Sequence, residues 1–88
     1  MKEEENKKAT EKQEEADEKF VIKPYLKSEL AEMYSPHLTT AGAMNKLNGW
    51  IRKNPELYSQ MYSGREGRKD VSYSTRQVRL IVTYLDEP

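Results

Sequence analysis

The chain has 88 residues, with 15 basic and 15 acidic side chains and therefore a formal net charge of zero at pH 7. It contains no cysteine, which excludes disulfide bonds and thiolate chemistry. It has neither the apolar core of a signal peptide nor the ~20 apolar residues of a membrane-spanning helix. We therefore expect a cytoplasmic protein with one small domain and no membrane contact.

Residues 1–19 differ from the rest of the chain. They carry five lysines against eight acidic residues, a net charge of −3. Their only apolar residues are Met1, Ala9 and Ala16, so no face of this segment is able to bury surface. We interpret it as a disordered, charged N-terminal arm. An alternative function for it is to shield the remaining domain from non-specific contacts.

Residues 20–88 form the predicted domain. They carry ten basic and seven acidic residues, a net charge of +3, and they contain every Tyr, Trp and Phe of the chain. A domain of this size buries only about 60% of the surface that its unfolded chain exposes. Its core is therefore small.

The first elements are a short strand and a short helix. Residues 20–23 are a short β-branched run ended by Pro24, which predicts an edge strand or an extended lead-in. Ser28 is the predicted N-cap of a helix over about 29–35, and Pro36 ends that helix. The spacing i, i+3, i+4 predicts a buried face made of Leu30, Met33 and Tyr34.

A longer amphipathic helix is predicted from Thr39 or Thr40 to about Lys53. Four apolar side chains at i, i+4, i+7 and i+8 make its inner face: Ala43, Leu47, Trp50 and Ile51. The opposite face carries Ala41, Asn45, Asn48 and Arg52, beside Lys46, Lys53, Gly42 and Gly49.

Two further helices follow. Asn54 and Pro55 predict the start of a third helix over about 55–63, ahead of a basic, glycine-punctuated loop at 64–70. After a short strand at 71–73, the S-x-x-Q capping box at 74–77 opens a last helix that ends near residue 85. Its inner face is Val78, Ile81, Val82 and Leu85, and a second apolar flank is Leu80 and Tyr84.

The fold class predicted is therefore mostly α: a compact four-helix domain of helix-turn-helix-like type, with at most a minor two-strand element. The flank made by Leu80 and Tyr84 has two explanations, which are burial in the centre of the domain and an interface with a second copy or a protein partner.

Nothing in the sequence favours catalysis. His37 is the only histidine, and no cysteine or second histidine completes a metal site with it. The carboxylates lie scattered among basic residues, and the glycines match no phosphate-binding or dinucleotide pattern. We expect a non-enzymatic protein without a cofactor or a metal ion.

DNA binding is the most specific hypothesis. Asn45, Asn48 and Arg52 share one helix face, and Asn and Arg are the side chains that pair with adenine and guanine in the major groove. Phosphate contacts would come from Lys46, Lys53, Arg65, Arg68 and Lys69. Against this, polar residues occupy any solvent-facing helix surface, the charge is only +3, and the turn before the second helix is long. The alternative is a protein-interaction adaptor or dimerisation module that uses Leu80 and Tyr84.

A set of short motifs gives the chain a family resemblance. They are Ser28-Glu29-Leu30-Ala31, Tyr34-Ser35-Pro36, Trp50-Ile51, Asn54-Pro55-Glu56-Leu57, Gln77-Val78 and Leu85-Asp86-Glu87-Pro88. With them, residues 25–88 resemble a family of short proteins from Bacteroidetes that is classed as a domain of unknown function. Members of that family more often have Phe in place of Ser35 and Gly in place of Asp86. The resemblance implies no activity.

Overall fold

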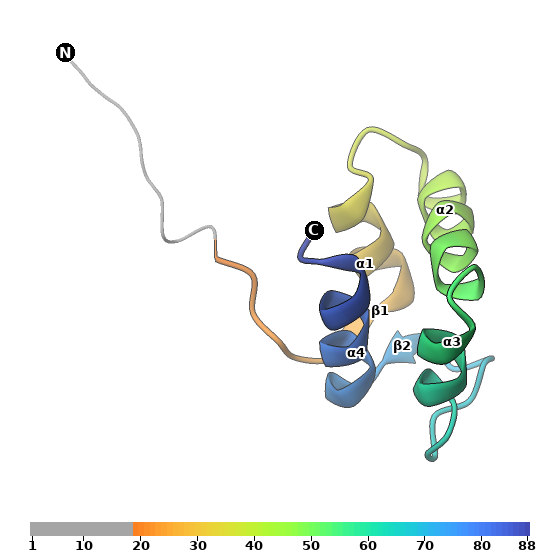
Figure 1. Cartoon of the computed structure of the whole chain (residues 1–88). Coiled ribbons are helices and arrows are strands. Elements are labelled where there is room, and N and C mark those ends of the chain that lie inside the picture. Colours follow the sequence, from red (N-terminus) through yellow and green to blue (C-terminus); the bar gives the residue numbers. More distant parts are fainter. Residues whose placement is uncertain (1–18) are drawn as a thin grey trace, which may run out of the picture.

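A computed structural model describes residues 19–88, and the predicted N-terminal arm lies outside this range except for its last residue. The described part has four helices and one antiparallel pair of short strands, which confirms the predicted fold class (Figure 1). In chain order the elements are β1 (Tyr25–Leu26), α1 (Lys27–Tyr34), α2 (Thr40–Arg52), α3 (Pro55–Met61), β2 (Ser72–Tyr73) and α4 (Thr75–Leu85).

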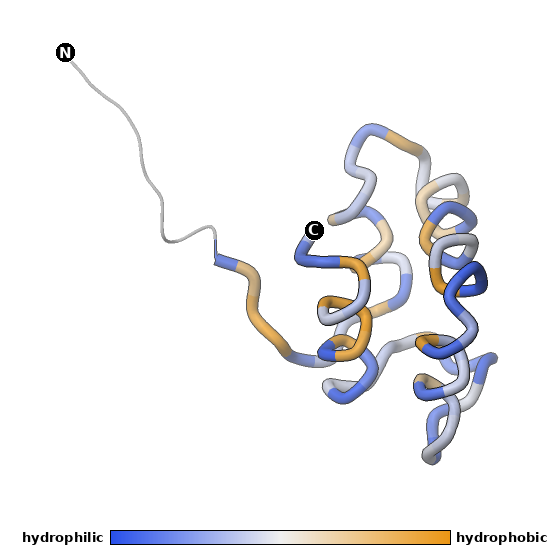
Figure 2. Tube along the Cα trace, viewed as in Figure 1, coloured by the Kyte–Doolittle hydropathy of each residue, from blue (hydrophilic) through white to orange (hydrophobic). Residues whose placement is uncertain are grey.

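The helices pack as two neighbouring pairs. Helices α1 and α2 run in opposite directions side by side, joined by the turn at 35–39, and α3 packs against α4 (Figure 1). Their buried side chains form one core, and Figure 2 shows short hydrophobic and hydrophilic stretches alternating along the helices. The fully buried apolar residues are Leu30, Ala31, Ala43, Leu47, Ile51, Leu57, Met61, Tyr73, Val78 and Ile81.

Three of the four helix starts follow the sequence signals. The hydroxyl of Thr39 accepts a hydrogen bond from the Gly42 N–H at 3.1 Å and caps α2. The Asn54 side chain caps α3 in the same way, with Pro55 at the first helical position. At α4, Ser74 and Gln77 form the reciprocal capping box that their spacing predicts.

The start of α1 differs from the prediction. Ser28 is not the N-cap, because the helix already begins at Lys27. The Glu29 carboxylate accepts a hydrogen bond from the Leu26 N–H at 3.0 Å, so an acidic side chain one turn inside the helix satisfies the orphan donor. Met33 is also exposed, at 41%, and Ala31 takes its predicted place in the core because α2 covers the Ala31 side of α1.

Of the two alternatives for residues 20–23, the edge strand is wrong, because the first strand lies later in the chain. Residues 20–23 form no strand, and the pairing is Tyr25 with Tyr73 and Leu26 with Ser72. Side chains hold the preceding segment instead. The Phe20 ring stacks on Tyr25 at 5.4 Å, and the Tyr25 hydroxyl donates to the Val21 carbonyl at 2.7 Å. Phe20 and Ile22 therefore pack against the core through their side chains, whereas Val21 is exposed, and backbone pairing begins only at Tyr25.

Helix α4 ends at Leu85, and the next residue, Asp86, is its C-cap and has a positive φ. This residue has φ 69° and ψ 172°, a conformation that glycine adopts far more easily than other residues. Its N–H donates to the Val82 carbonyl, and its own carbonyl accepts a hydrogen bond from the Tyr34 hydroxyl. Asp86 thus adopts a positive φ although it is not glycine. Its hydrogen bond with Tyr34 joins the end of α4 to the end of α1.

Candidate functional site

The outer face of α2 is exposed to solvent at the positions that matter for the DNA-binding hypothesis. Asn45, Asn48 and Arg52 are all exposed, while Leu47 and Ile51 point into the core. The helical period sets this division, since the two sets of residues lie on opposite sides at 100° per residue. The predicted inward orientation of the apolar stripe is therefore correct.

Trp50 lies at the margin between the two faces. It is half-buried and meets the Tyr34 ring edge-on, with the ring centroids 6.1 Å apart. The Lys46 ammonium lies 5.6 Å from the centre of the indole ring. Trp50 therefore packs at the edge of the α1–α2 contact, and the Lys46 side chain lies over its indole ring.

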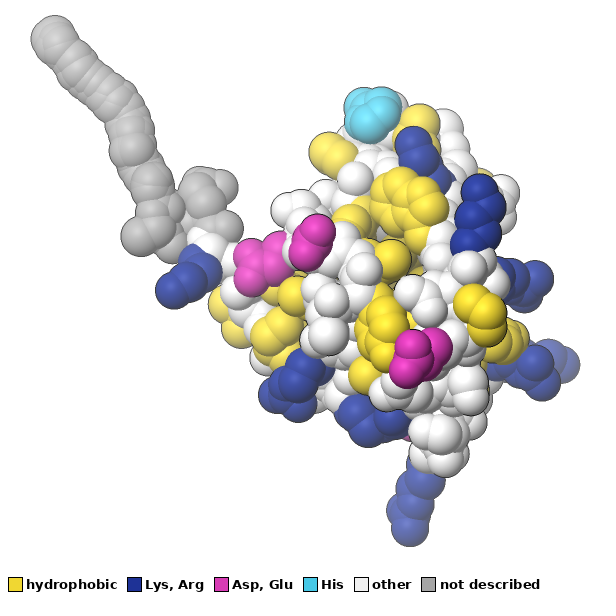
Figure 3. Space-filling model, in the orientation of Figure 1, with side chains coloured by type: hydrophobic (Ala, Val, Ile, Leu, Met, Phe, Trp, Pro, Cys, Tyr) yellow, Lys and Arg dark blue, Asp and Glu magenta, His cyan; other side chains and the backbone are white. Residues whose placement is uncertain are grey.

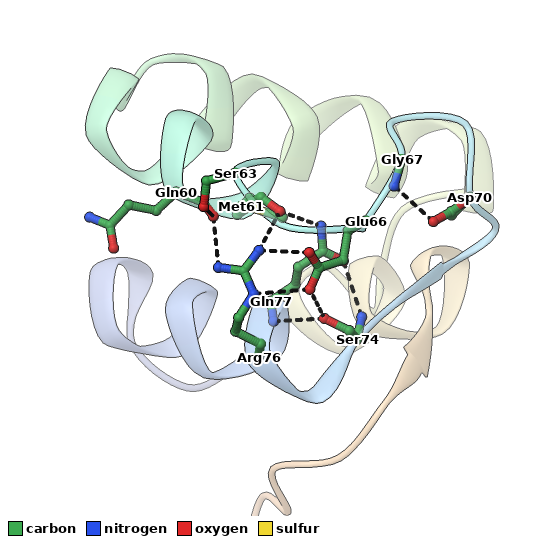
Figure 4. Close-up of polar contacts among 9 residues, drawn as sticks. All are labelled: Gln60, Met61, Ser63, Glu66, Gly67, Asp70, Ser74, Arg76 and Gln77. Carbon is green, nitrogen blue, oxygen red and sulfur yellow. Dashed lines mark hydrogen bonds and ion pairs between the residues drawn. The ribbon is translucent and has the colours of Figure 1, made fainter.

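The loop at 64–70 is tied to α3 and α4 by Arg76 (Figure 4). The Arg76 guanidinium makes two parallel hydrogen bonds to the Glu66 carboxylate, at 2.7 and 3.0 Å. It also donates to the carbonyls of Gln60 and Met61 at the end of α3. The bonds from Arg76 to the Glu66 carboxylate, with one from the Ser74 hydroxyl, lower the pKa of Glu66 from 4.5 to about 2. One arginine thus satisfies a helix end and fixes the start of the loop.

The tip of the loop is closed by local and long-range bonds. The Asp70 carboxylate accepts a hydrogen bond from the Gly67 N–H at 2.8 Å, and the Asp70 N–H donates back to the Gly67 carbonyl at 3.1 Å. The Lys27 ammonium donates to the Arg68 carbonyl at 3.0 Å. The tip therefore has a defined position against the start of α1.

These elements enclose a pocket of about 580 Å³ between the start of α1, one side of α2, α3 and the loop. Met44 and Ile51 contribute apolar surface, and the side chains of Tyr58 and Tyr62 form an aromatic wall. Its other lining residues are Leu26, Lys27, Ser28, Asn48, Arg52, Arg68, Lys69, Asp70 and Val71. Four of the lining residues are basic and one is acidic, so the pocket favours an anion.

Hydrogen bonding between the loop and α3 tunes the electrostatics of the pocket. Arg68 donates to the Tyr58 hydroxyl at 3.3 Å, which lowers the pKa of Tyr58 and raises that of Arg68. Burial lowers the pKa of Lys27, partly offset by the nearby Asp70 carboxylate. With four basic side chains and the single carboxylate of Asp70, the lining of the pocket still has an excess of positive charge.

The fold brings together four of the sequence-predicted binding residues, which come from two separate segments of the chain. Asn48 and Arg52 from α2 meet Arg68 and Lys69 from the loop around the pocket. The remaining candidates, Asn45, Lys46, Lys53 and Arg65, are exposed but do not line it. In Figure 3, basic side chains project along the α2 side of the molecule. A larger basic surface therefore extends from the pocket along α2.

Comparison with protein-family models places residues 21–88 in a domain of unknown function, DUF4248. The match covers more than half of the chain. The chain belongs to this family. This match confirms the predicted resemblance to a family that is classed as a domain of unknown function. Neither the curated proteins nor the solved structures that were searched contain a match to the chain.

Sequence reasoning missed the aromatic wall of this DUF4248 domain. The sequence spacing puts Tyr58 and Tyr62 on the same side of α3 as Leu57 and Met61, and only Leu57 and Met61 are fully buried. The sequence did contain a signal, since Tyr58 and Tyr62 are large aromatic residues at positions i and i+4, which makes them neighbours on the helix surface. Lys27 was missed as well, because only the fold brings the start of α1 to the loop.

The interface candidates lie elsewhere. Leu80 and Tyr84 are half-buried on α4 and pack against the core, and the Tyr84 hydroxyl accepts a hydrogen bond from Gln60 at 2.7 Å. His37 is exposed in the α1–α2 turn. Within residues 19–88, no three His, Asp or Glu side chains are grouped to hold a metal ion, and no helix is long and apolar enough to cross a membrane.

Proposed function

We propose that this DUF4248 domain is a non-enzymatic DNA-binding or regulatory module of helix-turn-helix-like type. Helix α2 is the element that contacts base edges, through Asn45, Asn48 and Arg52. The loop at 64–70 contacts phosphates through Arg65, Arg68 and Lys69, and Lys46 and Lys53 extend the phosphate-binding surface along α2.

The observation that carries this proposal is the convergence of α2 and the loop. Amide and guanidinium groups that suit base edges lie beside cations that suit phosphates, and both border the same pocket. The Arg76–Glu66 pair holds the loop in place before any partner arrives. Little conformational entropy would then be lost when the loop binds a phosphate backbone.

The first test is the salt dependence of binding to mixed-sequence duplex DNA, measured by fluorescence anisotropy with the full chain. With the five proposed phosphate contacts, affinity should fall about 500-fold between ~50 and ~200 mM salt. Binding through an apolar surface would instead change little or tighten with salt. Absence of binding to the duplex at low salt refutes the proposal.

The second test uses single charge removals of equal size. Arg68→Ala and Lys69→Ala each remove a proposed phosphate contact, whereas Arg79→Ala removes an exposed arginine of α4 that does not line the pocket. We expect the first two to reduce the salt slope by about 1 and Arg79→Ala to leave it nearly unchanged. Equal effects of all three variants would mean that only overall charge matters, and the assigned surface would then be wrong.

The competing function, a protein-interaction adaptor, places its contact at Leu80 and Tyr84. The support for this surface is weaker. Both side chains already pack against the domain core, and the Tyr84 hydroxyl has a partner in Gln60. The salt titration separates the two functions, since only the DNA-binding module loses affinity steeply with salt.

A further inference from the structure

The pocket beside α2 has more apolar and aromatic surface than a phosphate contact needs. Its volume, about 580 Å³, is in the range of small-ligand sites. Tyr58 and Tyr62 are adjacent rings on α3, with centroids 5.3 Å apart and planes 60° apart. Met44 and Ile51 of α2 also line it. A planar, apolar group that carries negative charge matches this combination.

We infer that the pocket receives an unpaired nucleotide, so that the domain prefers DNA with a single-stranded overhang to blunt duplex DNA. The inference rests on the proposed function and names the part of the nucleic acid that this site takes. The base would stack against the Tyr58–Tyr62 wall and contact Met44. Its phosphates would bind Arg68 and Lys69 at the rim.

The geometry explains why the nucleotide should be unpaired. In a duplex, the faces of a base are covered by its neighbours, so the tyrosine rings gain nothing unless the base leaves the stack at a cost in free energy. An overhanging base has a free face and avoids that cost. Asn48 lies at the pocket edge, where its amide is able to donate to and accept from a base edge.

The charges around the pocket support a nucleotide over an uncharged aromatic ligand. Arg52, Arg68 and Lys69 reach it from two different elements, and Lys27 lines it as well. The single acidic lining residue, Asp70, has its carboxylate turned to the Gly67 N–H. An aromatic group with an attached phosphate therefore satisfies both the wall and the rim.

The test compares a blunt DNA hairpin with the same hairpin that carries a short thymidine overhang, using the full chain. Stacking of one base on an aromatic side chain predicts about 5- to 150-fold tighter binding of the overhang. Equal affinity for both probes overturns the inference and leaves the proposed function standing. If neither probe binds, both proposals are wrong.

A pair of variants at one position isolates the aromatic ring. Tyr58→Ala removes the ring, and Tyr58→Phe keeps it but loses the hydroxyl that binds Arg68. We expect the overhang advantage to disappear in Tyr58→Ala and to persist in Tyr58→Phe. An advantage that survives in a folded Tyr58→Ala protein overturns the inference.

NMR spectroscopy of the unaltered chain gives a readout that does not depend on how a variant folds. The methyl groups of Met44 and Ile51 should shift when the overhang probe is added, because a stacked base would lie beside them. The blunt hairpin should leave these methyl signals nearly unchanged while it shifts the amides of α2. Methyl shifts of the same size with both probes, or with neither, overturn the inference.

Discussion

Gly49 lies inside α2 and connects the stability of the domain with its proposed function. An alanine methyl at this position would meet no other atom within 4 Å outside its own helix. Since no clash opposes it, Gly49→Ala should give the full difference in helix propensity, about 0.8–1.0 kcal/mol in favour of the folded state. For a domain of this size, that corresponds to a rise in Tm of roughly 4–8 °C.

Thermal unfolding followed by circular dichroism measures this change. Gly42→Ala is the matched control on the same helix, since the added methyl would lie 3.1 Å from the Thr39 hydroxyl that caps α2. We expect a smaller gain or a loss in that variant. A Gly49→Ala protein that unfolds at the same or a lower temperature than the original would refute the reasoning, because it would mean that the site is not open.

The same variant tests how closely DNA approaches α2. Gly49 is next to Asn48 and one turn from Asn45 and Arg52, so a bound phosphate backbone would come near its bare Cα. Gly49→Ala should therefore weaken duplex binding while it raises Tm. If both stability and affinity rise, close approach at Gly49 is wrong, although α2 itself remains a candidate.

Four further predictions concern other parts of the chain. Asp86→Gly should stabilise the domain by about 1 kcal/mol in denaturant unfolding by relieving its left-handed backbone, whereas Asp86→Ala, which keeps the Cβ, should not. Glu66→Gln should lower Tm at neutral pH and lose this effect as pH falls from 4.5 towards 2. The pKa of Glu66 is depressed to about 2, so its contribution to stability is present above pH 4.5 and disappears when the carboxylate is protonated. A difference in Tm between the two proteins that stays constant with pH contradicts this. Deleting residues 1–18, which carry eight acidic residues and four lysines, should tighten duplex binding at low salt and have little effect at high salt; equal affinities at low salt argue against shielding. Sedimentation equilibrium should find a monomer, and a dimer that Leu80→Asp dissociates without unfolding would favour the adaptor instead.

The sequence predicted the helices well because their signals are local. Caps at Thr39, Asn54 and Ser74 act within one turn, and the period of α2 alone separates Leu47 from Asn48. The start of α1 was wrong because two local signals competed, and the Glu29 carboxylate bonded to Leu26 instead of Ser28 capping the helix. The strand was misplaced for a different reason, since pairing depends on a partner more than 40 residues away.

The candidate site could be predicted only in part. The residues of α2 and the loop were identifiable by type, since Asn, Arg and Lys on exposed surfaces are the groups that nucleic acids bind. Their convergence with Tyr58 on one pocket was not predictable, because it depends on how α3 and the loop pack against α2. From the sequence, Arg76 is expected to be an ordinary surface charge. In the fold it bonds both to the Glu66 carboxylate of the loop and to the Gln60 carbonyl of α3.

The sequence by itself determined the mostly helical fold, the inward stripe of α2 and the polarity of its outer face, because helix caps and periodicity act between residues a few positions apart. The tertiary structure alone decided that Asn48 and Arg52 share a pocket with Arg68, Lys69 and Tyr58. The physical reason is that the loop takes its position from the bonds of Arg76 to Glu66 and of Lys27 to Arg68, which join separate elements that the packing of the helices brings together.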